Sequence, residues 1–443
     1  MNTSTFCGRH LGRVGRETSS SDENEDDTDA CYLPSQEEIE SLGSDDDESD
    51  ENEASGTTAN SIENQCFHDA LPETTAWRSM KSSSRAFDCT ATEERHFSHE
   101  LPTDRPIEPI DIYNLFVCDE VVELIVTETN NFFEETMGAT PSTRHSKVKQ
   151  WKPISAEDVK KLLGILITMG LNKQPTFDCY WSKSQIYGCE LIQKTMSRNK
   201  FELIMRFLHF ADNRLSDGSD RLYKLKPLID LISRNFLKFT PGKDVVIDEN
   251  LVLFRGRTIL RQYIPNKAHR YGLKFYKLCT IDGYTWKFII YKGQGDTAPN
   301  VSHSEYVTLS LMEGLLKEGR TLFVDNFYSS VTLARRLLEN KTYVCGTLRK
   351  NRKGNPKCVT DKKLKKGEVL GKENSEGIKV LKWKDKRDVL MLTTIPEHSD
   401  EKVKVAQRRG TEIVKPQCVL DYNSAKKGVD YSDQMGSYYS PLR

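Results

Sequence analysis

The spacing of apolar residues along the chain changes near residue 243. From about residue 105 to 242, apolar positions recur every three or four residues, which predicts an all-α region. Residues 155–158 (SAED) predict a capping box that opens an amphipathic helix. Two further helical stripes are Phe201, Ile204, Met205 and Leu208, and Leu225, Leu228, Ile229, Ile232 and Phe236. We expect these stripes to be core, and they indicate no chemistry.

After residue 243 the pattern becomes that of strands. Residues 245–254, 273–281 and 284–291 are rich in Val, Ile and aromatic side chains, and Asp282-Gly283 predicts a hairpin between the second and third. A helix is predicted around 306–316, a strand over 321–324, a helix over 330–339 and a strand over 342–347. The order β-β-β-α-β-α-β predicts an α/β (α+β) fold with a ribonuclease-H-like core over 243–348. Because a fold hosts many functions, the function has to be argued from a site.

Charge divides the chain further. The 443 residues have a net charge of −1, yet residues 1–60 contain 17 acidic and 3 basic side chains, a net of −14, so the remaining residues carry +13. We predict a disordered acidic N-terminal tail over 1–104, because it cannot bury enough apolar surface to offset ordering entropy. The tail is either a solvated segment or a mimic of nucleic acid that competes for the basic body. Residues 349–412 predict a basic, partly stranded insertion, and 413–437 a return to the core.

Several classes of protein are disfavoured. No apolar run approaches the roughly 18–20 residues of a membrane span, and the first ten residues lack the apolar core of a signal peptide. The eleven cysteines are scattered without a C-x-x-C pair, which favours reduced thiols over disulfides or a zinc site. There is no G-x-x-x-x-G-K-[ST] loop, no H-E-x-x-H and no G-x-S-x-G, so an NTPase, a zincin and an α/β-hydrolase are disfavoured.

Four aspartates are candidates for metal-dependent chemistry. Asp248 interrupts an apolar strand, which is costly unless the carboxylate is paired or binds metal. Asp325 ends the 321–324 strand, which the fold places beside the first, so the two carboxylates are expected to face each other. Asp430 and Asp433 are spaced i, i+3 on one helical face. The alternatives are a helix N-cap or turn residue at Asp325 and a solvated helical face for Asp430 and Asp433.

Basic and aromatic residues mix next to the first candidate carboxylate. They are Arg255, Arg257, Arg261, Tyr263, Lys267, His269, Arg270, Tyr271 and Lys274. A second cluster at the start of the insertion contains Arg349, Lys350, Arg352 and Lys353. Phosphate neutralisation needs such cations and makes binding salt-dependent. The alternative is an ordinary solvated loop, but the positive charge outside the tail favours a nucleic-acid partner. His269 is not expected to act as a catalytic base.

Several blocks, in order, resemble the piggyBac transposase family, especially the piggyBac-element-derived proteins of animal genomes. The blocks are 206–213 (RFLHFADN), 247–257 (IDENLVLFRGR), 269–276 (HRYGLKFY), 323–330 (FVDNFYSS), 346–354 (GTLRKNRKG), 383–392 (WKDKRDVLML), 421–423 (DYN), 428–434 (GVDYSDQ) and 438–440 (YYS). The resemblance covers about 105–443.

This resemblance implies a ribonuclease-H-like core with an insertion and a split helical dimerisation and DNA-binding domain, whose first half is 105–242 and whose second half begins at 438–443. It implies cut-and-paste transposition of double-stranded DNA, from transposon ends to TTAA targets, by a homodimer with two Mg²⁺ ions. By motif position, Asp248, Asp325 and Asp430 are the catalytic metal ligands, and Asp433 assists them. The family continues beyond the position of Arg443, so we expect transposition by this chain to be impaired.

Two function hypotheses remain open, together with the possibility of a fragment without a stable fold. The first is an Mg²⁺-dependent DNA strand transferase whose carboxylates are retained. The second is a domesticated or truncated protein that binds DNA or dimerises without catalysis. Both predict a nuclear location, supported by basic clusters such as 362–366, and neither involves a membrane or a small-molecule substrate.

Overall fold

The computed structural model describes residues 76–80, 86–87, 96–97, 101–139, 147–216, 218–254, 256, 258–264, 270–293, 301–406 and 412–441. Most of the predicted acidic tail lies outside these residues. Residues 72–443 form one compact unit. Within the predicted tail, the short strands β1 (Arg78–Ser79) and β2 (His96–Phe97) were not expected. They form because isolated apolar side chains dock on the unit: Met80 is 9% exposed, and the Phe97 ring lies 4.9 Å from that of Phe239.

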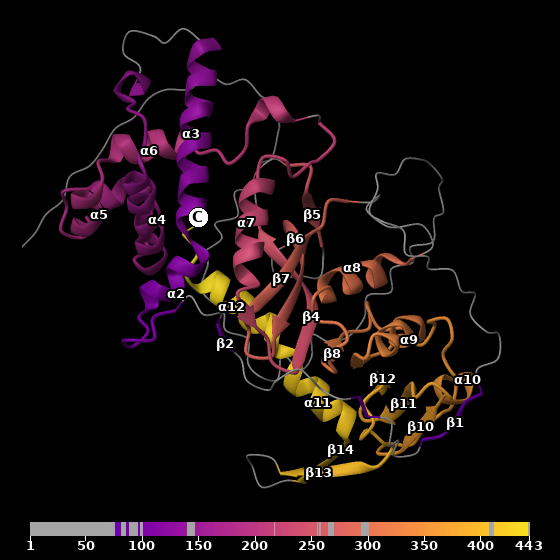
Figure 1. Cartoon of the computed structure of the whole chain (residues 1–443). Helices are drawn as coiled ribbons and strands as arrows, with labels where there is room; N and C mark the ends of the chain where they lie inside the picture. The colour runs from indigo at the N-terminus through magenta and orange to yellow at the C-terminus, as the bar shows by residue number, and fades with distance from the viewer. Residues whose placement is uncertain are drawn as a thin grey trace, which may run out of the picture. The chain divides into compact units, whose positions relative to one another are not determined.

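Helices occupy the first half of the unit (Figure 1). Their bounds are α2 (Pro109–Phe116), α3 (Asp119–Ala139), η1 (Lys147–Gln150), α4 (Ala156–Leu171), η2 (Phe177–Trp181), α5 (Glu190–Thr195), α6 (Arg198–Phe207), η3 (Asn213–Leu215) and α7 (Lys226–Phe236). The predicted capping box is present at α4: the Ser155 hydroxyl accepts from the Asp158 backbone N–H, and the Asp158 carboxylate accepts from the Ser155 N–H. None of the helices in the described residues is both long and apolar enough to cross a membrane.

Two members of the predicted helical stripes are not core. Met205 is 38% exposed, because α6 packs through Phe201, Ile204 and Phe207 instead. Leu225 is 37% exposed, because it is the N-cap residue of α7 rather than part of the helix.

A ten-stranded sheet forms the second half. Its order is β1-β10-β11-β12-β9-β8-β4-β6-β5, and β7 pairs with β6. Strand bounds are β4 (Asp244–Leu253), β5 (Arg261–Tyr263), β6 (Tyr271–Thr280), β7 (Thr285–Ile290), β8 (Thr321–Val324), β9 (Tyr343–Thr347), β10 (Val369–Glu373), β11 (Lys379–Lys384) and β12 (Asp388–Thr393). β8 is parallel to both β4 and β9, whereas the other pairs are antiparallel. With α8 (His303–Met312) and α9 (Val331–Glu339), these elements confirm the predicted β-β-β-α-β-α-β order and add the short β5.

The basic insertion is largely stranded and joins the same sheet. β12 pairs with β9, with Thr393 opposite Cys345, and β10 and β11 continue the sheet beyond it. The helix α10 (Lys357–Thr360) lies in the insertion. β13 (Lys402–Ala406) and β14 (Glu412–Pro416) form a separate hairpin, and β3 (Phe239–Thr240) pairs with β2.

The sheet is covered on both faces, and alternate residues of β4 point to opposite faces. Val245 and Ile247 pack with α8 and α9, which defines the α8–α9 face. Val246 packs with residues of α11 (Gln417–Ala425) and α12 (Lys427–Tyr438), which defines the α11–α12 face. Figure 1 shows α11 and α12 in yellow beside β4. Asp248 therefore belongs to the α11–α12 face and Glu249 to the α8–α9 face.

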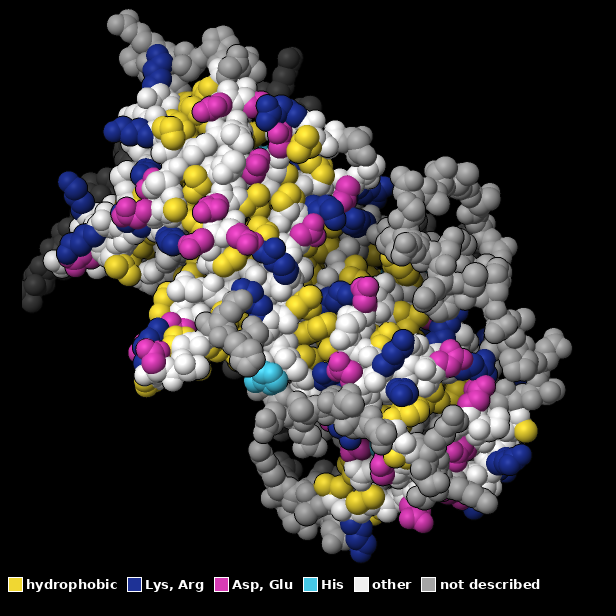
Figure 2. Space-filling view, viewed as in Figure 1, with side chains coloured by type: hydrophobic (Ala, Val, Ile, Leu, Met, Phe, Trp, Pro, Cys, Tyr) yellow, Lys and Arg dark blue, Asp and Glu magenta, His cyan; other side chains and the backbone are white. Residues whose placement is uncertain are grey.

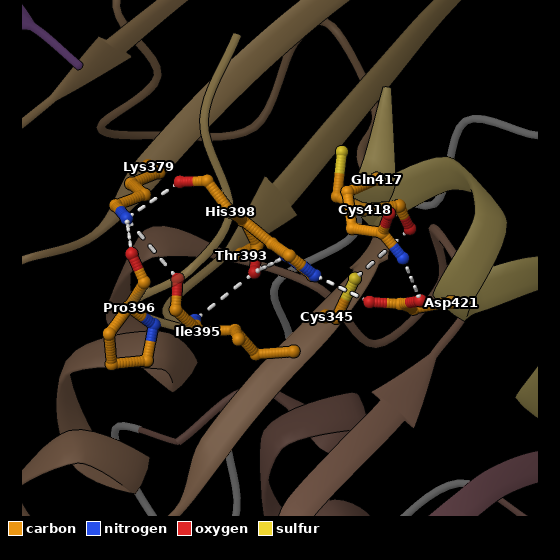
Figure 3. A network of polar contacts seen from close by, with 9 residues as sticks. All are labelled: Cys345, Lys379, Thr393, Ile395, Pro396, His398, Gln417, Cys418 and Asp421. Atoms are coloured by element: carbon orange, nitrogen blue, oxygen red, sulfur yellow. Dashed lines mark hydrogen bonds and ion pairs between the residues drawn. The ribbon is translucent and has the colours of Figure 1, made fainter. Parts of the chain in front are cut away.

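A buried polar network ties the insertion to α11 (Figure 3). The His398 ring, 1% exposed, lies between Thr393 Oγ1 at 2.7 Å and Asp421 Oδ2 at 2.8 Å. Gln417 Nε2 donates to the other oxygen of the same carboxylate at 2.6 Å. The buried Lys379 ammonium donates to three backbone carbonyls of the loop that carries His398. These bonds satisfy polar groups whose burial would otherwise be costly, so the end of the insertion is fastened to the helix that leads into α12.

Candidate active site

Asp248 and Asp325 lie next to each other on neighbouring parallel strands. Ile247 of β4 is the register partner of Val324 of β8, and Asp248 and Asp325 directly follow these two residues in the chain. Adjacent strands lie about 4.8 Å apart, and residues in register point to the same face. Both aspartates therefore belong to the α11–α12 face, with Asp248 in the middle of β4 and Asp325 directly after the carboxyl end of β8. Their adjacency was expected from the predicted strand order.

The electrostatics of the site show that the two carboxylates share one environment. The pKa of Asp325 is raised to about 6, chiefly by burial and then by the negative charge of Glu249. The pKa of the Tyr422 hydroxyl is raised by burial and then by the charges of Asp325 and Asp248. Tyr422 lies on α11, so the charges of both aspartates act on this covering helix. A carboxyl whose charge is disfavoured in this way is suited to bind a cation.

Asp325 is held in place by its own loop. Its Oδ1 accepts from the backbone N–H of Phe327 at 2.9 Å. The next side chain, Tyr328, is 1% exposed and reaches under β4, where its hydroxyl lies 3.5 Å from Glu249 Oε2. Lys274 Nζ lies 3.7 Å from the same oxygen. Glu249, Lys274 and Tyr328 thus form a polar cluster on the α8–α9 face, opposite the face that carries Asp248.

Asp430 and Asp433 both lie on α12, as predicted, but in different surroundings. Asp433 is half-buried and forms an ion pair with Lys277 of β6, with 2.9 Å between Oδ1 and Nζ. Lys277 is the cross-strand partner of Asp248, so Asp433 lies near the first carboxylate through this lysine. Asp430 is exposed in the first turn of the helix. Within the described ranges, no three His, Cys, Asp or Glu side chains are close enough together to hold a metal ion.

The oxygen donors that are present fit a hard divalent cation. Mg²⁺ usually binds through one or two carboxylates together with water and substrate phosphates, rather than in a cage made wholly by protein. Asp248 and Asp325 supply two carboxylates. Asn250, on the same face of β4, is 7% exposed, and its Oδ1 has no hydrogen-bond partner among the described residues. A buried acceptor left unpaired costs about 1–3 kcal/mol, and a cation or its bound water would satisfy it.

The predicted DNA-binding residues fall into four groups. Arg349 and Arg352 adjoin the site: Arg349 Nε donates to Asn326 Oδ1 at 3.1 Å, and Arg352 donates to the Phe327 carbonyl. The side chains of Lys350, Lys353, Arg261 and Arg270 are exposed, and Lys274 belongs to the Glu249 cluster. Arg255, Arg257, Lys267 and His269 lie outside the described residues.

Basic side chains are not gathered into one field on the face seen in Figure 2. Lys and Arg side chains alternate there with Asp and Glu side chains. The insertion contributes an exposed basic run at 362–366, interrupted by a half-buried leucine. Among the described residues, Arg349 and Arg352 bring positive charge next to the Asp325 loop.

Several residues of the site were missed by the sequence argument. They are Glu249, Asn250, Lys277, Tyr328 and Tyr422. Glu249 and Asn250 directly follow Asp248, and alternation along β4 could have assigned each to a face. Lys277 and Tyr422 carry no such signal, because only strand register and helix packing bring them to the aspartates.

Comparison with known proteins places this chain among transposases. The family described as "Transposase IS4" matches residues 108–443. PiggyBac transposable element-derived protein 3 of Homo sapiens is 29% identical over 356 residues, which cover 76% of this chain and 57% of that protein. PiggyBac transposable element-derived protein 2 of Homo sapiens is 27% identical over 345 residues, covering 74% of this chain and 56% of that protein. The chain therefore spans a little over half the length of these relatives.

A solved structure agrees in fold. The cryo-EM structure of a piggyBac transposase synaptic complex with hairpin DNA matches with a TM-score of 0.66 and 26% sequence identity. The match covers 78% of this chain and 71% of that one. Together with the strand order, it confirms the ribonuclease-H-like fold expected from the sequence.

Proposed function

Because the chain belongs to the piggyBac-type transposase family, we propose that it cleaves and joins DNA at the carboxylates Asp248 and Asp325 with the help of divalent cations. The observation that carries the proposal is the parallel register of β4 and β8, which sets the two carboxylates side by side. The pKa of Asp325 is raised to about 6 by burial and then by the charge of Glu249, so a bound cation would offset an unfavourable negative charge there. In this proposal the DNA target is TTAA.

Each part of the site has a role in this proposal. Asp248 and Asp325 hold the cation, with Asn250 as a neutral oxygen donor beside them. A bound Mg²⁺ pair would supply charge stabilisation at the attacking and leaving oxygens of the phosphodiester. Arg349 and Arg352 position the phosphate backbone next to the Asp325 loop, as charge-assisted hydrogen-bond donors. Asp430 completes the set from α12 when DNA is bound.

A plasmid assay tests the proposal without knowledge of the transposon ends. Supercoiled plasmid containing TTAA sites is incubated with the full chain and Mg²⁺ or Mn²⁺, and nicked and linear products are separated on a gel. We expect metal-dependent nicking that Asp248→Asn and Asp325→Asn abolish. Asp385→Asn, which removes an exposed carboxylate at the β11–β12 turn, is the matched control and should leave nicking unchanged. A folded chain that nicks no DNA with either metal contradicts catalysis.

The second candidate is DNA binding without catalysis. It is favoured by the exposure of Asp430 and by the ion pair that engages Asp433. Fluorescence anisotropy with a labelled duplex separates the candidates. Binding that weakens with salt and with Arg349→Ala, yet is unchanged in Asp325→Asn, together with no nicking, supports this alternative.

We also propose a homodimer located in the nucleus. DNA is the partner of the solved relative, and residues 362–366 offer an exposed basic run. Light scattering coupled to gel filtration gives the oligomeric state, with a monomer at all concentrations counting against the dimer. A fluorescent fusion that is excluded from nuclei would contradict the location.

A further inference from the structure

Lys277 places a positive charge among the candidate carboxylates. It lies in the middle of β6, on the α11–α12 face, where its side chain is only 14% exposed. Its cross-strand partner is Asp248, and such partners have Cβ atoms about 4.5–5.5 Å apart. A lysine this far buried needs compensation, because transferring an unpaired charge out of water is very costly.

The compensation comes from α12. Lys277 Nζ lies 2.9 Å from Asp433 Oδ1 and 3.2 Å from Ser432 Oγ. The Ser432 hydroxyl is in turn 2.7 Å from the Thr285 hydroxyl, so the ammonium is fixed between β6 and the helix. The face of the sheet that carries Asp248 therefore also carries the ammonium of Lys277, which is paired with Asp433.

We propose that the ε-ammonium of Lys277 is a built-in cation of the site, which withholds Asp433 from metal binding and limits the divalent-cation affinity of Asp248 and Asp325. This inference rests on the proposed function, because it takes those two aspartates to be the cation-binding pair. It gives a function to the ion pair of Lys277 with Asp433, which engages a carboxylate on the face that carries Asp248. It also assigns Lys277 a role that differs from holding α12 in place.

The two roles make opposite predictions for cation binding. If Lys277 only fastens α12, removing its charge loosens the site and leaves cation affinity unchanged or lower. If Lys277 acts as a resident cation, removing its charge frees Asp433 and raises the affinity. A unit charge about 6 Å from a divalent ion changes the binding constant about tenfold even at the dielectric constant of water, and by more in a half-buried site.

The test is Mn²⁺ binding by the full chain, with free Mn²⁺ measured by electron paramagnetic resonance. Lys277→Met keeps the length of the side chain without charge, and Lys277→Gln also keeps a hydrogen-bond donor for Ser432, should the Met variant fail to fold. We expect both to bind Mn²⁺ about tenfold more tightly than the unmodified chain, and Lys277→Arg to bind as the unmodified chain does. Adding Asp433→Asn to Lys277→Met should cancel the gain.

Lys287→Met is the matched control. It removes the ion pair of Lys287 with Glu313, on the neighbouring strand and the opposite face, and should leave Mn²⁺ affinity unchanged. Folded Lys277 variants that bind Mn²⁺ no more tightly than the unmodified chain overturn the inference. If that unmodified binding is lost in Asp248→Asn and Asp325→Asn, the proposed function nevertheless stands. Mn²⁺ binding seen only in the Lys277 variants supports the inference, and no binding by any protein refutes both.

Discussion

Replacing Asp325 by Asn should stabilise the metal-free protein at neutral pH. The pKa of this carboxyl is raised from 3.8 to about 6, so the folded state disfavours its ionised form. A rise of about two pKa units corresponds to about 3 kcal/mol. Above pH 6 the folded wild-type chain bears this whole cost, whereas the neutral Asn does not. The Asn Oδ1 can still accept from the Phe327 backbone N–H, which limits other losses.

The sign of the pH dependence follows from the direction of the shift. Between about pH 4 and pH 6 the folded state retains a proton that the unfolded state has released, so wild-type stability falls as pH rises through this window. The advantage of Asp325→Asn should therefore be about 3 kcal/mol at pH 7.5 and shrink to about 1 kcal/mol at pH 4.5. Urea unfolding monitored by circular dichroism at both pH values measures it directly.

A second carboxylate provides the control with the opposite sign. The pKa of Asp388 is lowered by hydrogen bonds from Lys382 and then Lys384, so its charge favours the folded state. Asp388→Asn should lose stability at pH 7.5. Millimolar Mg²⁺ should stabilise the wild-type chain but not Asp325→Asn, because only the former can bind it there. An Asp325→Asn variant that is no more stable than wild type at pH 7.5 would refute the electrostatic account of this site.

Three further predictions concern packing and buried polar groups. Gly428→Ala should lower the free energy of unfolding by about 1–3 kcal/mol, because the added Cβ would lie 2.4 Å from the Thr280 carbonyl oxygen. The control is Gly436→Ala on the same helix, whose added Cβ meets nothing within 4 Å. Equal melting temperatures for the two variants would contradict this packing of α12. Lys379→Met should lower the free energy of unfolding in urea by at least about 2 kcal/mol, because three buried backbone carbonyls lose their hydrogen-bond donor. An unchanged urea midpoint would contradict this prediction. Burial raises the pKa of Asp421, but hydrogen bonds from His398 and Gln417 outweigh it and lower the pKa. Asp421→Asn should therefore reduce the free energy of unfolding near pH 7, and the reduction should become smaller as pH falls below 4. A reduction that does not depend on pH would contradict this prediction.

The fold could be predicted in its order of elements because periodicity is a local property. The strand over 321–324 was predicted with the bounds that β8 has, since a β-branched threonine and three consecutive apolar residues, bounded by polar ones, suffice to indicate a buried strand. The short strands β1, β2 and β5 were missed. Two or three residues carry too little periodicity, and these strands form only because an edge or a hydrophobic surface is available.

The candidate site could be predicted in part for a related reason. Asp248 stands out as a charge within an apolar strand, and Asp325 as the residue that ends one, so each is visible locally. Their adjacency follows once β4 and β8 are taken to be parallel neighbours, which strand order alone suggested. The position of Asp430 at an exposed turn of α12, and the pairing of Asp433 with Lys277, depend on how that helix packs.

By itself, the sequence determined which residues are chemically unusual and in what order the elements occur, since both depend on neighbours along the chain. Only the tertiary structure decided which charged side chains form ion pairs with each other. Lys277 is far from Asp433 in the chain, and neither residue is unusual in its local context. Their ion pair exists because β6 lies beside β4 and α12 crosses both, and such long-range register is a property of the packed chain.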